Sequence, residues 1–278
     1  MKYLFVSCLF FLITIRLSAQ NNQLQAIYKV TYKPNKENSD KKVEYMILEI
    51  NNLKSHFYNL DLKKIDSLVI KNDALLTDDY PLPNLTFSVF KDLSSKNIQI
   101  SGNFNQFEYV FKEEETIVWN LLMEKKNPVK LKNDKFSTRT AETYYGGRGW
   151  LVEYTQEIPI PDGPYVFSGL PGLVCKAFSV DRDYIFELVD IRKTKQNRKF
   201  TTIKNNITRE EITSLINDFL KKPSDQKITY KNIWGDIMYY ESKGKNDDSY
   251  KSNEERIKNI INSFNNPIDK SLFIINLR

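Results

Sequence analysis

The sequence predicts a mainly β protein with some helix, built on a curved antiparallel sheet of the sandwich or half-barrel type, with a helical C-terminal part. Short runs rich in Thr, Tyr, Phe, Val and Ile recur along most of the chain, and clusters of Lys, Asn, Gly and Asp separate them. Near the C-terminus, helical spacing and a capping box replace this pattern. We therefore expect a signal peptide at 1–20, a β-rich domain at 21–200 and a mixed helix and strand extension at 201–278.

The first twenty residues are typical of an export signal. Lys2 gives a positive start, residues 3–13 are almost entirely apolar, and small residues precede the expected cleavage after Ala19 or Gln20. The apolar run is too short to cross a bilayer, since a spanning helix needs about 20 such residues. We expect an exported protein, periplasmic or extracellular, with no transmembrane span after signal removal. An uncleaved N-terminal anchor is the alternative.

The β-rich domain is predicted to be an antiparallel meander of short strands. Its clearest hairpin joins 173–180 to 184–192 through a turn at residues 181–183. A short helix is expected at 61–70, where apolar residues follow helical spacing. The other expected strands are 26–32, 43–50, 54–58, 85–90, 98–100, 107–111, 117–123, 129–131 and 138–145.

The C-terminal extension has a different pattern. Thr208 and Glu211 form a capping box that begins a helix, and this helix ends before Pro223. A strand within 227–240 and a helix at 254–264 are expected to follow. The apolar stripe of the first helix consists of Ile212, Leu215, Ile216 and Phe219.

Charge and cysteine content exclude several classes of protein. The net charge of +6 is spread along the chain without a dense basic block, so we expect no nucleic-acid partner. Of the two cysteines, Cys8 lies in the expected signal and Cys175 alone remains in the mature chain. An intramolecular disulfide and a cysteine zinc site are therefore impossible. The apolar neighbours of Cys175 predict a buried thiol.

The densest sequence information lies between residues 146 and 189. Prolines hold this segment extended and glycines permit turns and close backbone approach. Pro171 and Gly172 suit the central positions of a type II turn, which would let Leu170 and Leu173 insert together into the core. The segment is either a structural corner that joins two strands or a recognition loop. The motif consists of Gly163, Pro164, Gly169, Leu170, Pro171, Gly172, Leu173 and Val174.

Through this segment the sequence resembles the GLPGLI family, secreted proteins best represented in Bacteroidetes-type bacteria and named for a hexapeptide. Here the hexapeptide occupies residues 169–174, with Val174 in place of the final Ile. The resemblance implies export and a β-rich fold. The molecular activity of the family is unknown, so the resemblance supplies no catalytic residue. Further matches are Gly147-Arg148, Ile158-Pro159, Gly163-Pro164 and Phe186-Glu187-Leu188.

Four residues of this region are candidates for binding a ligand or partner. Arg148 stands in a Gly-rich turn, where it can bind an anion or pair with Glu157 or Asp162. An internal salt bridge is the simpler interpretation. The aromatic side chains of the region can pack or bind. The candidate set is Arg148, Trp150, Asp162 and Tyr165.

The sequence assigns no catalytic residue, no metal ligand and no cofactor. The single histidine, His56, lies in an alternating strand without a nucleophile elbow nearby, and one histidine cannot build a histidine metal site. A calcium site from Asp78-Asp79, Asp162 or residues 181–183 lacks the required loop spacing.

The preferred function is non-enzymatic binding or scaffolding in the cell envelope, with envelope proteins or a small apolar ligand as partners. The first alternative is a carrier that holds a lipid or peptide in a cupped sheet, which the 17 Phe and 16 Tyr could line. The second is a secreted hydrolase that uses paired carboxylates. Its candidate acids are Glu153, Glu157 and Asp162, with Trp150 and Tyr154 as sugar contacts.

Overall fold

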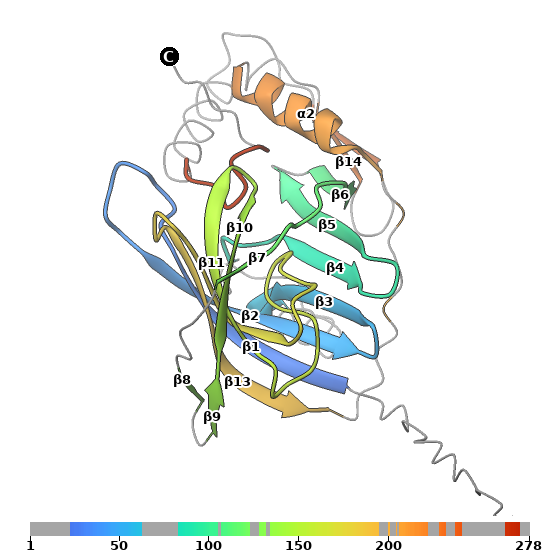
Figure 1. Cartoon of the computed structure of the whole chain (residues 1–278). Helices are drawn as coiled ribbons and strands as arrows, with labels where there is room; N and C mark the ends of the chain where they lie inside the picture. Colours follow the sequence, from blue (N-terminus) through green and yellow to red (C-terminus); the bar gives the residue numbers. More distant parts are fainter. Residues whose placement is uncertain are drawn as a thin grey trace, which may run out of the picture.

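The structure is a computed structural model (Figure 1). The expected signal at 1–20, nearly all of the expected helix at 61–70 and the expected helix at 254–264 lie outside the residues it describes. The described residues are 23–62, 83–104, 107–122, 128–131, 134–194, 200, 204, 206–221, 228–231, 237–240 and 265–272.

In the described part of the chain, eleven strands form one large antiparallel sheet that does not close (Figure 1). Its order is β6-β5-β4-β3-β2-β1-β13-β12-β11-β10-β7. The strands are β1 (Gln23–Tyr32), β2 (Lys42–Asn51), β3 (Lys54–Asn59), β4 (Ser88–Asp92), β5 (Asn97–Phe104), β6 (Phe107–Glu113), β7 (Asn120–Leu122), β10 (Arg139–Tyr145), β11 (Arg148–Thr155), β12 (Leu173–Ser179) and β13 (Tyr184–Lys193).

Two meanders meet at the pairing of β1 with β13. The first runs from β1 to β6, and the second runs from β10 to β13 on the other side of β1. Two further hairpins stand apart from this sheet: β8 (Pro128–Leu131) with β9 (Asp134–Ser137), and β14 (Ile228–Lys231) with β15 (Ile237–Tyr240). The predicted mainly β architecture with a large antiparallel sheet is therefore confirmed.

Most expected strands are present, with two differences. The hairpin of β12 and β13 forms as predicted, and the left-handed Asn52 completes the turn between β2 and β3. The expected strand at 117–123 is shorter, because only Asn120–Leu122 pair with β10. Strand β11 was not anticipated, since its first residues were interpreted as a Gly-rich turn. The turn is shorter and consists of Gly146 and Gly147, both left-handed.

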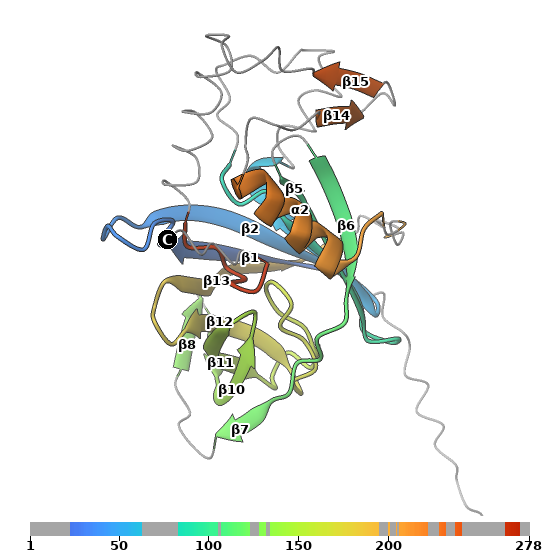
Figure 2. The same ribbon diagram turned by 90° about the horizontal axis from the view of Figure 1, so that it is seen from above.

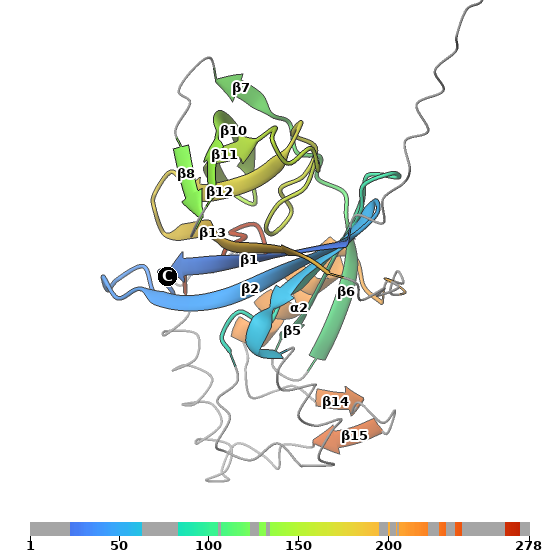
Figure 3. The same ribbon diagram turned by 90° about the horizontal axis from the view of Figure 1, so that it is seen from below.

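The sheet curls so that its ends approach each other around a concave face. Strands β10 and β11 stand across β1–β3, and β4–β6 rise on the opposite side (Figures 1 and 3). Register irregularities occur between Ile27 and Tyr28 in β1 and between Glu153 and Tyr154 in β11. Such irregularities bend a strand and increase its twist, which favours the curl.

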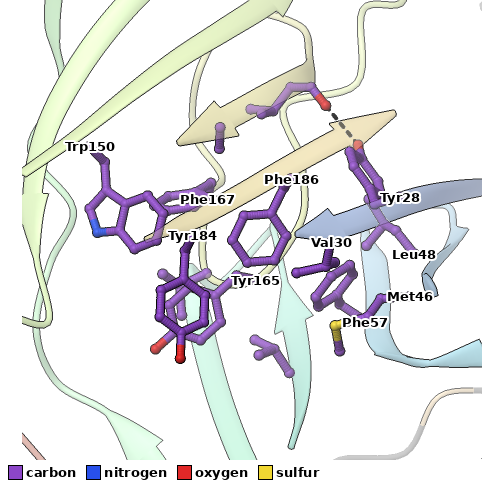
Figure 4. Close-up of a cluster of buried hydrophobic side chains, with 14 of the residues drawn as sticks. Tyr28, Val30, Met46, Leu48, Phe57, Trp150, Tyr165, Phe167, Tyr184 and Phe186 are labelled. Atoms are coloured by element: carbon purple, nitrogen blue, oxygen red, sulfur yellow. Dashed lines mark hydrogen bonds between the residues drawn. The ribbon is translucent and has the colours of Figure 1, made fainter. Parts of the chain in front are cut away.

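The segment 156–172, which joins β11 to β12, fills the concave face. Phe167 of this segment packs edge-on against Trp150 of β11, with ring centroids 4.9 Å apart, and against Phe186 of β13 at 6.3 Å. Figure 4 shows these rings together with Tyr165 and Phe57 in one buried cluster. Buried aromatic rings of this size contribute most of the apolar area of such a core.

Helix α2 (Arg209–Lys221) and the segment 265–272 cover one open end of the curled sheet (Figure 2). The predicted capping box is confirmed: the Thr208 amide donates to Glu211 Oε2 at 2.8 Å, and the Glu211 amide donates to Thr208 Oγ1 at 3.1 Å. Of the predicted apolar stripe, Ile212 and Ile216 are buried and Leu215 is partly buried, while the Phe219 side chain lies outside the described part of the structure. Among the described residues, no helix is long and apolar enough to cross a membrane.

Replacing Gly172 with alanine should strongly destabilise the protein. Gly172 has a φ of +156°, and an added Cβ would lie 2.0 Å from the Thr155 carbonyl oxygen. We expect Gly172→Ala to lower the free energy of unfolding by about 3 kcal/mol or more, measured by urea denaturation. Gly149→Ala is the matched control: its Cβ would meet only the exposed Val180 side chain, so a loss of about 1 kcal/mol or less is expected. Equal losses in the two variants would contradict this account.

Candidate functional site

The segment 156–172 is held rigid by its own backbone hydrogen bonds. The Gly169 amide donates to the Pro161 carbonyl at 3.0 Å, and the Val174 amide donates to the Asp162 carbonyl at 2.9 Å. Tyr165 takes a left-handed conformation with φ of +52°, which is unusual for a bulky residue. The segment is therefore a closed loop with a defined shape, packed inside the curled sheet. This agrees with the structural corner that the sequence suggested.

The predicted type II turn at Pro171 and Gly172 is wrong. The Leu173 amide donates to Ile158 and not to Leu170, while the Gly172 amide donates to the Leu170 carbonyl at 2.8 Å. This is a tighter three-residue turn centred on Pro171. It brings Gly172 against the backbone of β11, where only glycine fits. Leu170 and Leu173 are nevertheless buried together in the core, as expected.

Asp162 is the polar centre of the segment. Its Oδ1 lies 2.5 Å from Nζ of Lys91 in β4, and both side chains are fully buried. The Lys91 ammonium also donates to the Gly163 carbonyl at 2.6 Å. Burial is the main cause that lowers the pKa of Lys91, while the charge of Asp162 acts in the opposite direction. The pair thus fastens the segment to the opposite half of the sheet.

Arg148 is buried at the start of β11 and holds the C-terminal segment. Its Nη1 lies 2.6 Å from Asp181 Oδ2, and its Nη2 donates to Asn266 Oδ1 at 2.5 Å and to the Pro267 carbonyl at 2.8 Å. Its Nε donates to the Ile268 carbonyl at 3.2 Å. The planar guanidinium thereby lies against two carboxylates, with Asp183 Oδ2 at 3.6 Å as the second, and donates to three acceptors of one loop. An internal salt bridge fits this arrangement, with Asp181 and Asp183 as the partners. The expected partners were wrong, because Glu157 accepts the Ser137 amide and Asp162 pairs with Lys91.

Trp150 and Tyr165 meet around Phe167 in the core. Trp150 Nε1 donates to the Tyr145 carbonyl at 3.1 Å, and Tyr165 packs edge-on against Tyr145 at 5.8 Å. Both rings are almost completely buried. The four predicted binding residues therefore all lie inside the protein, but they do not form one site. Asp162 pairs with Lys91, Arg148 binds Asp181 and the C-terminal segment, and Trp150 and Tyr165 lie in the aromatic core. Whether any of them binds a ligand stays a prediction.

Sequence reasoning missed a second polar cluster, at the open end of the sheet. Arg209, the first residue of α2, pairs with Glu113 of β6 and with Asp269, whose Oδ2 lies 3.0 Å from Nη1. The Tyr145 hydroxyl donates to Glu113 at 2.6 Å. Burial, followed by the nearby Tyr165 and Glu113, raises the pKa of Tyr145. One signal was available: a cation in the first turn opposes the helix dipole, so Arg209 needs a local anion.

The carboxylates proposed for a hydrolase have separate partners. Glu153 faces Lys176 across β11 and β12, Glu157 accepts the Ser137 amide at 2.8 Å, and Asp162 pairs with Lys91. Burial raises the pKa of Glu153. No described contact joins these three acids.

His56 lies on the outer face of the sheet, opposite Glu49 in β2 and stacked on Tyr58 at a centroid distance of 4.6 Å. The Tyr58 hydroxyl donates to Glu49 at 3.0 Å. In the part of the chain that the structure describes, no three or more His, Cys, Asp or Glu side chains are grouped to hold a metal ion.

The fold and its buried polar groups define a β-rich protein built on one open antiparallel sheet. No family model matches the sequence, and no curated protein matches it. Among solved structures, the chain is similar to PNGF-II in its P21 crystal form, at 14% identity with a TM-score of 0.48, over 75% of this chain and 35% of that one. The C2 crystal form of PNGF-II is similar at 15% identity with a TM-score of 0.47, over 74% of this chain and 34% of that one. The chain thus spans about a third of the length of the solved chains it matches.

Replacing Arg148 with lysine should loosen the C-terminal segment. Lysine keeps the charge but cannot donate in the directions that the guanidinium uses, so we expect a loss of about 2–4 kcal/mol in the free energy of unfolding. Hydrogen exchange at the amides of Asn266 and Lys270 should rise in the same variant, since both amides bond to neighbouring loops. Arg139→Lys, at an exposed position in β10, should change stability by less than about 0.5 kcal/mol. Unchanged exchange at these amides would show that Arg148 does not hold the segment.

The buried Cys175 should make stability fall at alkaline pH. The prediction of a buried thiol is confirmed, and burial is the main cause that raises the pKa of Cys175 from 9.0 to about 12. A raised pKa stabilises the folded state fully below pH 9.0, and this contribution is lost as the pH rises towards about 12. Urea denaturation between these values should therefore show a shallower decline for Cys175→Ala than for the wild-type chain. Parallel curves, or rapid alkylation of the folded protein at neutral pH, would contradict the burial of the thiol.

Proposed function

We propose that the protein is a non-enzymatic binding or scaffolding protein of the cell envelope. The observation that carries this proposal is that the chain fills its own concave face with the segment 156–172. The conspicuous polar residues of that segment and its surroundings, Asp162 and Arg148, are engaged by other parts of the same chain. These features support a rigid body that acts through its outer surface. The envelope location rests on the export signal expected at 1–20.

The outer face near β10 offers an apolar surface for a partner. Tyr144 and Val180 are 70% and 65% exposed and lie on either side of Gly149, and the Val180 side chain packs over the glycine. Val118 is also exposed, and its carbonyl accepts the hydroxyl of Thr143 in β10 at 2.8 Å, which places its backbone beside β10. Exposed apolar residues grouped in this way are typical of protein-binding surfaces. Envelope proteins are therefore the partners we favour.

The carrier alternative needs room that the described concave face does not offer near the sheet centre. Ring contacts join Trp150, Phe167 and Phe186 to one another, and Phe186 to Phe57. The Tyr28 hydroxyl donates to the Val174 carbonyl at 2.7 Å in the same region (Figure 4). A lipid or peptide could enter only if the segment 156–172 moved out. The hydrolase alternative lacks support from geometry, since its three proposed acids contact different partners.

Site-specific photo-crosslinking in the source organism tests the proposal. A photoreactive phenylalanine at Tyr144 should yield a discrete crosslinked envelope protein, while the same probe at Leu53, 54% exposed in the β2–β3 turn, should not. Adding Val180→Asp to the Tyr144 probe should weaken the crosslink about tenfold, because it places a charge in the contact. Both positions are exposed, so the fold should be unaffected.

Two outcomes would reject the binding role. One is the same crosslinked species from Tyr144 and Leu53, which would indicate chance encounters. The other is a lipid or peptide bound one-to-one to the purified chain in native mass spectrometry, which would support the carrier alternative instead.

A further inference from the structure

The ion pair between Lys91 and Asp162 is unusual because it is fully buried and because one of its carboxylate oxygens has no hydrogen-bond partner among the described residues. Both side chains have 0% exposure, and the Nζ to Oδ1 distance is 2.5 Å. Asp162 Oδ1 also accepts the Gly163 amide at 2.8 Å. The other carboxylate oxygen, Oδ2, is buried and has no hydrogen-bond partner among the described residues. Stable buried ion pairs normally satisfy their remaining lone pairs, and this one does not.

The surroundings of the pair disfavour two separate charges. Lys91 of β4 is fully buried, and its ammonium contacts Asp162 and Gly163 of the segment that fills the concave face. Burial lowers the pKa of Lys91, which favours the neutral amine. Transfer of one proton from the ammonium to the carboxylate would replace two buried charges by a neutral amine and a neutral acid in contact. A neutral amine is a nucleophile, and a neutral carboxylic acid is an electrophile.

We propose that Lys91 and Asp162 become joined by an isopeptide bond between Nζ of Lys91 and Cγ of Asp162, formed inside the folded protein without a cofactor or a second enzyme. Contact at this distance in a rigid, water-excluded site supplies the proximity that an amide-forming condensation lacks in water. The reaction removes the charge from both side chains. It also removes the unpartnered oxygen, since Oδ2 is the atom that leaves.

The atoms of the step balance within the pair. A proton moves from the Lys91 ammonium to Asp162 Oδ2, and the amine lone pair then attacks Cγ. Negative charge develops on Oδ1, where the Gly163 amide already donates a hydrogen bond. The Gly163 carbonyl accepts from Nζ at 2.6 Å and orients the amine. The Cγ–Oδ2 bond breaks, and Oδ2 departs as water with the two protons that Nζ has lost.

The first test is the mass of the full chain under denaturing conditions. We expect the intact mass to be lower than the sequence mass, after any signal removal, by one water molecule. Proteolysis should give a branched peptide that contains both Lys91 and Asp162. The pair of Lys176 and Glu187, 2.8 Å apart but 31% and 38% exposed, is the internal control and should remain unlinked. Separate linear peptides carrying Lys91 and Asp162 would overturn the proposal.

An Asp162→Asn variant gives an independent test. Attack of Lys91 on the amide would release ammonia and yield the same linked product as the wild-type chain. The two linked proteins would therefore have identical masses, whereas unlinked proteins would differ by the mass difference between an acid and an amide. Different masses from two folded proteins would show that no bond forms. If the variant does not fold, the wild-type peptide map alone decides.

Discussion

A sheet that curls without closing leaves an apolar concave face, and something must cover that face. In this protein the cover is the segment 156–172, which comes from the connection between two neighbouring strands. Phe167 contacts rings of β11 and β13, and Tyr165 contacts Phe87 just before β4, so the two halves of the sheet share one core. The curvature of the sheet and the position of the segment are therefore mutually dependent.

Three buried polar contacts, called anchors below, fix the relative positions of segments that apolar packing alone would not specify. Lys91 and Asp162 join the segment to β4, Arg148 joins β11 to the segment 265–272, and Arg209 joins α2 to β6. Each anchor pairs buried charges at a defined geometry, although Asp162 Oδ2 and Arg209 Nε keep no hydrogen-bond partner among the described residues. Such groups specify one arrangement more than they add stability. The anchors lie at different depths, from the fully buried Lys91 to the partly exposed Arg209.

Local patterns in the sequence predict the local structure well. The reciprocal bonds of Thr208 and Glu211 could be inferred from spacing alone, because a capping box is a short-range device. The alternation of apolar residues likewise predicts most strands. Lys91 could not be identified in this way, since a lysine in a short strand has the same pattern whether it faces water or the core. Its partner is 71 residues away, and only the three-dimensional course of the chain brings them together.

The anchoring of the last described residues has a consequence for how the protein is made. Asn266 donates to the Lys33 carbonyl and accepts from Arg148, so this segment contacts both the first and the second meander. Strand β1, near the start of the chain, finds its partner β13 only after about 150 further residues have been synthesised. A ribosome must therefore release nearly the whole polypeptide before the native packing can be completed.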